Sequence, residues 1–469
     1  MTTAATETPL PTLDSLTEEA IAHRSEVAAE PTWLRDRRLE AYKRWADLEW
    51  PRLRGEEAWK DTPFTRFAVD LPLVSGEGGV LAGDDGPTAQ TAGAPAVLVD
   101  GLARVGARAD LRDGELEIRL SEAQEGAGVV VCDLAEAALR YEGLVREHLG
   151  RLTVDHDRTV AANDAAWTRG VFVYVPEEAE LDTPLAVTVR VGQPGAHLPR
   201  LLVVVDRHAS AQLFLEHVSM GLGDARATVD EVVEVVVADG AKLDFVTIQD
   251  WEGRVGHMTV QGFELHRDSE VRHLAVTIGG ESVRLRPEVR LVGPGSRIEP
   301  LGVYFSEGGQ HFEHHPFIEH LAGHATSDVL YKGALQGRSR TVFRGHIYVH
   351  RDAVGSDSNE TNKSLILSEG AKADSTPFLE IECSEVKAGH GSATGQVDEN
   401  QLFYLRSRGI PPEDALRLVV FGFFSEVLER IGIPAVRERA MSYIAEELDH
   451  VDLAAVGRRH SGSPEGVET

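Results

Sequence analysis

The highest density of side chains able to bind a metal lies at residues 311–324, which read His-Phe-Glu-His-His-Pro-Phe-Ile-Glu-His-Leu-Ala-Gly-His. A neutral imidazole can ligate iron or zinc, but a metal site needs at least three ligands that converge. In an extended strand, His311 and Glu313 would share one face and His314 would lie on the other. We therefore expect polar histidines on a solvated sheet face here rather than a metal site.

Four further residues are candidates for chemistry on their type alone. His346 and His350 have an even spacing, so they would share one face of a strand, again toward solvent. Cys132 follows a Gly-Val-Val-Val run and Cys383 follows Phe-Leu-Glu-Ile-Glu, so both are expected to be buried, inert thiols. Two cysteines cannot form a disulfide framework or a four-thiolate site, which fits a reducing compartment.

The sequence carries no common catalytic motif. It has no Gly-rich loop ending in Gly-Lys-Ser/Thr, no Gly-x-Ser-x-Gly segment before a helix, and no recognisable set of nucleophile, base and orienting residue. The alternative from the enzyme class is a β-helix carbohydrate-active enzyme, which would need two carboxylates on one face of a turn, and the many acids form no such signature. We therefore expect no catalytic activity of its own.

The composition limits the partners. The 469 residues carry a formal net charge of −29, which repels nucleic acid and anionic membrane surfaces. No apolar run approaches the roughly 18 residues that a membrane span needs. The N-terminal residues contain no basic, apolar signal segment. These features predict a cytoplasmic protein.

The first part of the chain, residues 1–160, is expected to be helical or mixed. It contains predicted helices at 13–30 and 134–149, and a Gly/Asp-rich loop at 76–93. From about residue 167 the texture changes to short β-branched runs bounded by Gly, Asp or Pro, which indicate strands. No helical pattern interrupts these strands before residue 411.

A degenerate repeat runs through the strand region. A turn residue followed by a small residue recurs at intervals of 32, 28 and 27 residues, with a later echo at Gly370. The repeat begins at His208, Gly240, Asp268 and Gly295. Self-similarity at this period, with strands and no helices, favours a β-helix over residues 161–400. A β-sandwich or β-barrel would also accommodate the pattern.

The C-terminal region, residues 401–456, is predicted to be helical. Pro411 and the acids after it open one helix, and its apolar stripe includes Val419, Phe423 and Val427. A second helix is expected at 435–448, followed by a polar tail at 457–469. The stripe is larger than one short helix pair needs, so part of it is expected to face a partner.

One long segment, from Pro377 to Ile410, resembles the C-terminal signature of the SufB/SufD family of iron–sulfur cluster assembly proteins. Its centre reads Val-Lys-Ala-Gly-His-Gly and its end reads Leu-Phe-Tyr-Leu-Arg-Ser-Arg-Gly-Ile. The similarity begins near Gly309, extends to Leu428, and continues more weakly around Asn163–Pro184.

The resemblance implies a right-handed parallel β-helix with helical regions at both ends. It also implies pairing with a SufB-like paralogue through the β-helix, and docking of a SufC-like ATPase on the helices at 411–450. Such a complex builds a nascent iron–sulfur cluster and can hold a reduced flavin. A homodimer of the isolated chain is a further expectation.

The same resemblance points to the SufD branch. SufB proteins carry a reactive cysteine before an Asp-Ser pair, and the matching position is read here as Ala373. The histidine thought to complete the iron or cluster site falls on His390, so His390 is the expected metal- and cofactor-binding residue. Many SufD proteins have a cysteine two residues earlier, where this chain has Ala388. The alternatives are a structural histidine in a Gly-rich bend and a SufB-like, sulfur-accepting homodimer.

Overall fold

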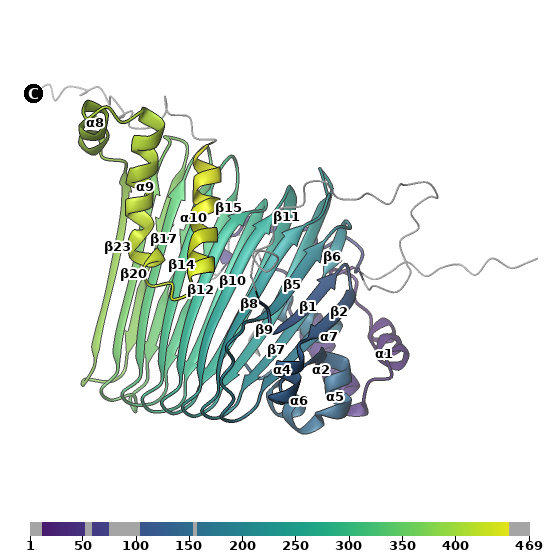
Figure 1. Cartoon of the computed structure of the whole chain (residues 1–469). Coiled ribbons are helices and arrows are strands. Elements are labelled where there is room, and N and C mark those ends of the chain that lie inside the picture. Colours follow the sequence, from purple (N-terminus) through teal and green to yellow (C-terminus); the bar gives the residue numbers. More distant parts are fainter. Residues whose placement is uncertain (1–11, 52–58, 75–103, 153–156, 450–469) are drawn as a thin grey trace, which may run out of the picture.

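The structure is a computed structural model that describes residues 12–51, 59–74, 104–152 and 157–449. The predicted Gly/Asp-rich loop at 76–93 and the predicted tail at 457–469 lie outside the described residues. Within them the chain is mainly β, and it forms a solenoid of about eight turns built from two long sheets (Figure 1). The predicted parallel β-helix is confirmed.

The first sheet contains ten strands, and all neighbours from β1 onward are parallel. In spatial order it consists of β2 (Glu115–Leu120), β1 (Ala107–Arg112), β5 (Leu185–Val191), β8 (Ser210–Ser219), β10 (Lys242–Trp251), β12 (Glu270–Gly279), β14 (Arg297–Ser306), β17 (Thr326–Leu335), β20 (Asp357–Ile366) and β23 (Lys387–Gln396).

The second sheet faces the first across the lumen of the solenoid, and several of its turns are split into two short strands. It consists of β3 (Val130–Asp133), β4 (Arg169–Val175), β6 (Gly195–His197), β7 (Pro199–Val205), β9 (Arg226–Val237), β11 (Arg254–Leu265), β13 (Ser282–Leu291), β15 (His311–His314), β16 (Phe317–His320), β18 (Arg340–Phe343), β19 (His346–Val349), β21 (Lys372–Ser375) and β22 (Phe378–Ile381).

The repeat in the sequence marks one corner of this solenoid. His208, Gly240, Asp268 and Gly295 all have positive φ, between 54° and 76°. That left-handed conformation turns the chain into the next strand of the first sheet two residues later, and Gly, Asn and Asp adopt it most readily. His324 and Gly355 occupy the same corner in later turns. Gly370 instead precedes β21, so it belongs to a corner that feeds the second sheet.

Alternation along each strand separates the lumen from the outer faces. The lumen is filled mainly by Val, Leu, Phe and Ala from both sheets, as the β-branched runs require. Burying one such aliphatic side chain stabilises the fold by about 1.5–3 kcal/mol. Polar side chains replace apolar ones at a minority of lumen positions. The side chains at these positions could bind a ligand or transfer a proton.

Near the N-terminus, helices pack against the second sheet and against one another. These elements are α1 (Glu18–Val27), α2 (Thr32–Asp47), the 3-10 helix η2 (Phe64–Arg66), α4 (Glu122–Gly126), α5 (Leu134–Arg140), α6 (Glu142–His148) and α7 (Arg158–Ala166). The predicted helix at 13–30 is shorter than expected, because the Thr17 hydroxyl caps it. The predicted helix at 134–149 divides at Tyr141 into α5 and α6.

The C-terminal helices are α8 (Glu399–Ser407), α9 (Pro412–Leu428) and α10 (Pro434–Leu448), and α9 and α10 lie on the outer face of the first sheet (Figure 1). Val427 is fully buried against that sheet, whereas Val419 and Phe423 are only partly buried. Among the described helices, none has the length and apolarity to cross a bilayer.

Candidate functional site

His390 lies on β23, the last strand of the first sheet, and is exposed. Its register partner on β20 is Glu360, so both side chains are on the lumen side of the sheet. Within the described part of the chain, no hydrogen bond or ion pair is found for the His390 ring. The imidazole predicted to bind iron is therefore placed at the open end of the solenoid, with its nitrogens available.

Among the described strands, β23 has a partner on one side only, β20. The Lys387 N–H donates to the Ser356 carbonyl at 3.0 Å, so residue 387 directs its amide toward β20. Successive residues alternate in this direction, so the N–H and C=O of His390, Ser392 and Thr394 point to the open edge. A long strand with an unpaired edge readily adds a strand from another chain.

The glycines beside His390 are not required by packing against the described residues. A Cβ at Gly389 would approach no described atom closer than 3.7 Å, and one at Gly391 none closer than 3.9 Å. Neither glycine has a positive φ. Their effect is to leave the outer face of β23 bare, which permits close approach by another backbone.

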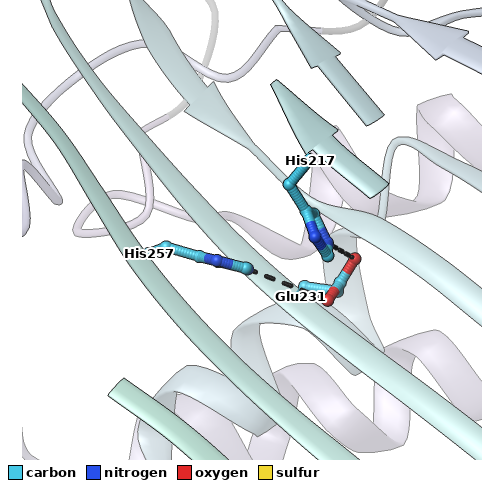
Figure 2. Close-up of side chains that lie close together, drawn as sticks. All are labelled: His217, Glu231 and His257. Atoms are coloured by element: carbon cyan, nitrogen blue, oxygen red, sulfur yellow. Dashed lines mark hydrogen bonds and ion pairs between the residues drawn. The ribbon is translucent and has the colours of Figure 1, made fainter. Parts of the chain in front are cut away.

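A second candidate is a buried triad in the lumen, formed by His217 on β8, Glu231 on β9 and His257 on β11 (Figure 2). One ligand atom from each lies within 4.8 Å of the others, and all three residues are at most 1% exposed. His217 Nε2 lies 2.8 Å from one Glu231 oxygen, and the Thr259 hydroxyl donates to the other at 2.8 Å.

The hydrogen bonds of the triad assign its protons. His217 Nδ1 contacts the Ile248 carbonyl at 3.2 Å and must donate to it. Its Nε2 faces the Glu231 carboxylate, so both ring nitrogens of His217 lie against hydrogen-bond acceptors. Burial acts to raise the pKa of Glu231, but the charge and hydrogen bond of His217 hold it well below its usual range.

His257 does not offer a metal its free lone pair. The Trp251 indole N–H donates to His257 Nδ1 at 3.1 Å, so the neutral ring carries its proton on Nε2. That Nε2 points toward Glu231 at 3.7 Å and has no hydrogen-bond partner among the described residues. Burial lowers the pKa of His257 to about 4. The triad is therefore a buried, hydrogen-bonded His217–Glu231 pair with a second histidine, His257, beside it.

The histidine cluster at 311–324 is arranged as predicted, but its histidines from 311 to 320 are buried and only His324 is exposed. His311 and Glu313 share the outer face, their side chains are 2.6 Å apart, and His314 points into the lumen. The expectation of an exposed sheet face was wrong, because Glu313 is 1% exposed beneath the 59–67 segment. Glu313 also contacts Arg284 at 2.9 Å, the Thr62 hydroxyl at 2.8 Å and His315 at 3.1 Å. Burial opposes ionisation, but His311, His315 and Arg284 lower the pKa of Glu313.

The other residues that the sequence singled out are two cysteines and two histidines, and none of them belongs to a cluster of metal ligands among the described residues. Cys132 is buried, and burial raises the pKa of its thiol to about 12, so it is the inert thiol that was expected. Cys383 is only half-buried and follows the end of β22. His350 and His346 are also half-buried, and they pair with Glu319 and Glu380 of adjacent turns at 2.9 and 3.6 Å.

Sequence reasoning missed the triad and Glu360. Glu231 had a local signal, since it is an acid inside a Val-rich run, at an inward position of the strand. Glu360 also occupies an inward position, is 0% exposed, and has no hydrogen-bond partner for either carboxylate oxygen among the described residues. Burial raises the pKa of Glu360 to about 8.

A cavity of about 570 Å³ is lined in part by His311, on the outer face of the second sheet. Its lining includes the basic side chains Lys60, Arg66, Arg338, Arg340 and Lys372. Arg340 is already paired with Asp61 and Asp374. Part of the positive charge around this cavity is therefore balanced within the chain.

The fold and the polar open end define a β-solenoid protein that presents a histidine at an unpaired strand edge. Two family models match this chain: the SufBD core domain of the SUF system for iron–sulfur cluster assembly over residues 188–423, and the SufBD N-terminal region over residues 116–187. The chain belongs to the SufBD family of iron–sulfur cluster assembly proteins.

Curated relatives agree with this assignment. An iron–sulfur cluster assembly SufBD family protein of Mycobacterium leprae is 40% identical over 309 residues, covering 64% of this chain and 77% of the relative. The corresponding protein of Mycobacterium tuberculosis is 39% identical over 310 residues, with the same coverage. The iron–sulfur cluster assembly protein SufB of Bacillus subtilis is 27% identical over 439 residues, covering 92% of this chain and 91% of that protein.

Proposed function

We propose that this chain is a SufD-like scaffold subunit without ATPase activity, which holds a nascent iron–sulfur cluster where its solenoid meets a SufB-like partner. The observation that carries the proposal is the position of His390 on the unpaired last strand, β23. Iron accepts a neutral imidazole nitrogen, and the strand edge around it is free to bind a second chain.

The residues around His390 set what the partner must supply. Positions 373 and 388 are both alanine, so neither offers a thiolate. His390 contributes one nitrogen to iron, and sulfur ligands would come from the partner or from the sulfide of the cluster. Gly389 and Gly391 provide the space for the partner backbone.

The C-terminal helices are proposed as the docking site for a SufC-like ATPase. α8 buries none of its residues, and Phe403 and Tyr404 on it are 73% and 57% exposed. Leu418 on α9 is 52% exposed. Exposed aromatic and aliphatic side chains on neighbouring helices are typical of a protein interaction surface.

The proposed role of His390 is tested by His390→Ala in the co-purified complex, with iron and sulfide analysis as the readout. We expect the complex to assemble as in the wild type and the cluster yield to fall. His23→Ala, an exposed histidine on α1, is the matched control and should leave the yield unchanged. A full cluster yield in His390→Ala would exclude a ligand role.

A second candidate is a SufB-like scaffold that accepts sulfur within a homodimer. The similarity to SufB of Bacillus subtilis over 92% of this chain favours it. In that case Cys383, the half-buried thiol, would carry the sulfur as a persulfide. Mass spectrometry of Cys383 after sulfur transfer tests this candidate, and an unmodified thiol would eliminate it.

A further inference from the structure

Glu360 differs from the other buried carboxylates of this solenoid. Glu231 is held by His217 and Thr259, and Glu313 by basic and hydroxyl groups. Both oxygens of Glu360 are enclosed, and neither has a hydrogen-bond partner among the described residues. A buried polar group without partners costs several kcal/mol on the order-of-magnitude scale of transfer data, so it calls for an explanation.

The neighbours of Glu360 on β20 are committed elsewhere. The Ser358 hydroxyl is 2.7 Å from that of Ser327. Asn362 donates to the Ser375 hydroxyl at 2.9 Å and accepts from the Tyr304 hydroxyl at 3.1 Å. These polar groups therefore satisfy one another, and none of them is a partner for the Glu360 carboxyl.

The lumen is shaped to accommodate this carboxyl. A Cβ at Gly345, on the opposite wall, would lie 1.0 Å from a Glu360 oxygen. The carboxyl thus fills the space that a side chain at position 345 would take. His390 is the register partner of Glu360, on the next strand outward, and parallel strands lie about 4.8 Å apart. The two side chains are therefore neighbours on the same face of the sheet. Glu360 is buried on β20, and His390 is exposed on β23, the last strand.

We propose that Glu360 is a second iron ligand, which together with His390 forms a carboxylate–imidazole pair at the open end of the solenoid. This inference rests on the proposed function, in which His390 faces iron shared with the partner. Iron(II) accepts both oxygen and nitrogen ligands, and an anionic carboxylate offsets the charge of the metal in a poorly hydrated lumen. On ligation the metal replaces the carboxyl proton, which leaves to solvent.

The test is a titration with Co²⁺, a spectroscopic substitute for Fe²⁺. The sample is the full-length chain purified in complex with its SufB-like partner. Four forms are compared: wild type, Glu360→Gln, His390→Ala and the control Glu385→Gln, an exposed acid between β22 and β23. We expect Glu360→Gln and His390→Ala each to weaken Co²⁺ binding by roughly tenfold or more, since even lost outer contacts of metal ligands cost about that much. Glu385→Gln should bind as the wild type does.

The outcomes separate the two claims. Weaker binding in His390→Ala with unchanged binding in Glu360→Gln would overturn the role of Glu360 and leave the proposed function intact. Unchanged binding in both variants, or no binding by the wild type, would overturn both. Weaker binding in Glu360→Gln alone would overturn the pairing with His390. Glu360→Gln keeps the side-chain shape, and an unchanged or higher Tm would establish that its effect is not misfolding.

Discussion

At the N-terminal end of the solenoid, the chain closes its own lumen. β1 and β2 form an antiparallel pair, Ala109 and Leu111 fill the lumen, and Ile118 and Leu120 pack against them. At the C-terminal end, the matching lumen positions of β23 are small or polar, and the strand is exposed. A solenoid needs a cap at each end, because every turn has an apolar face to bury. In the proposed function, the partner subunit supplies the second cap.

The largest expected effect comes from blocking the open end. Gly391→Trp adds a bulky side chain to the outer face of β23, where no described atom of this chain lies within 3.9 Å of the new Cβ. We expect a normal Tm and complete loss of co-purification with the partner subunit. Gly143→Trp, on an open surface of α6, is the matched control and should retain the partner. Retained binding in Gly391→Trp would show that the partner does not approach this face.

The next largest effect lies at the capped end, where buried charges link helices to the second sheet. Arg200 is paired with Asp164 on α7 and at 2.5 Å with Glu234 on β9, and it is 2% exposed. Arg200→Met removes one charged partner from each of two buried carboxylates, although Asp164 keeps Arg44 and Glu234 keeps the backbone N–H groups of residues 150–152. We therefore expect a loss of about 1.5–3 kcal/mol in the free energy of unfolding, the usual cost of losing a hydrogen bond to a charged group. Denaturant unfolding of the isolated chain measures this loss.

A matched surface pair supplies the control for that measurement. Arg119 pairs with Glu117 on β2, and both side chains are largely exposed. Arg119→Met should therefore leave the unfolding midpoint unchanged. Equal losses in Arg200→Met and Arg119→Met would contradict the assignment of stability to the buried network.

A smaller effect is expected from the neutral histidines of the lumen. Burial lowers the pKa of His273 and of His314 to about 3, from a reference value of 6.5. As pH falls below 6.5 the unfolded chain binds protons that the folded chain does not, so stability falls until about pH 3. Each such histidine contributes a slope on the order of 1.4 kcal/mol per pH unit.

His273→Leu isolates one contribution to this slope. The ring lies between Phe245 and Phe263, and neither of its nitrogens has a hydrogen-bond partner among the described residues. We expect the variant to retain its stability at neutral pH and to lose less stability than the wild type on acidification. An identical dependence of stability on pH in wild type and variant would mean that folding does not lower the pKa of His273.

The smallest effect on stability is expected at the exposed aromatics of α8. Replacing Phe403 and Tyr404 together by Ser should change the free energy of unfolding by less than about 0.5 kcal/mol, since neither side chain is buried. The same double variant should fail to capture a SufC-like ATPase in a pull-down assay. Undiminished capture would place the docking surface elsewhere. Deleting 411–469 would be a poorer test, because α9 and α10 cover apolar side chains of the first sheet.

The sequence predicted the solenoid because its signals are local. Strand runs of β-branched residues and corner residues such as His208 and Gly240 have the same meaning wherever they occur. The environments of the polar residues depend on distant segments. Glu313 is buried because Thr62, some 250 residues earlier in the chain, covers it. The triad of His217, Glu231 and His257 forms only when the solenoid turns stack in one particular register. No pattern in a single sequence predicts that register.

Hydrogen exchange of β23, in the isolated chain and in the complex with the partner subunit, tests the central claim most directly. In the isolated chain, the amides of His390, Ser392 and Thr394 face an open edge and should exchange fast. In the complex a partner strand should cover that edge, and peptides spanning 387–396 should gain protection while β1 and β2 do not. Equal exchange of β23 in both states would contradict the account of this end as the shared iron-binding interface.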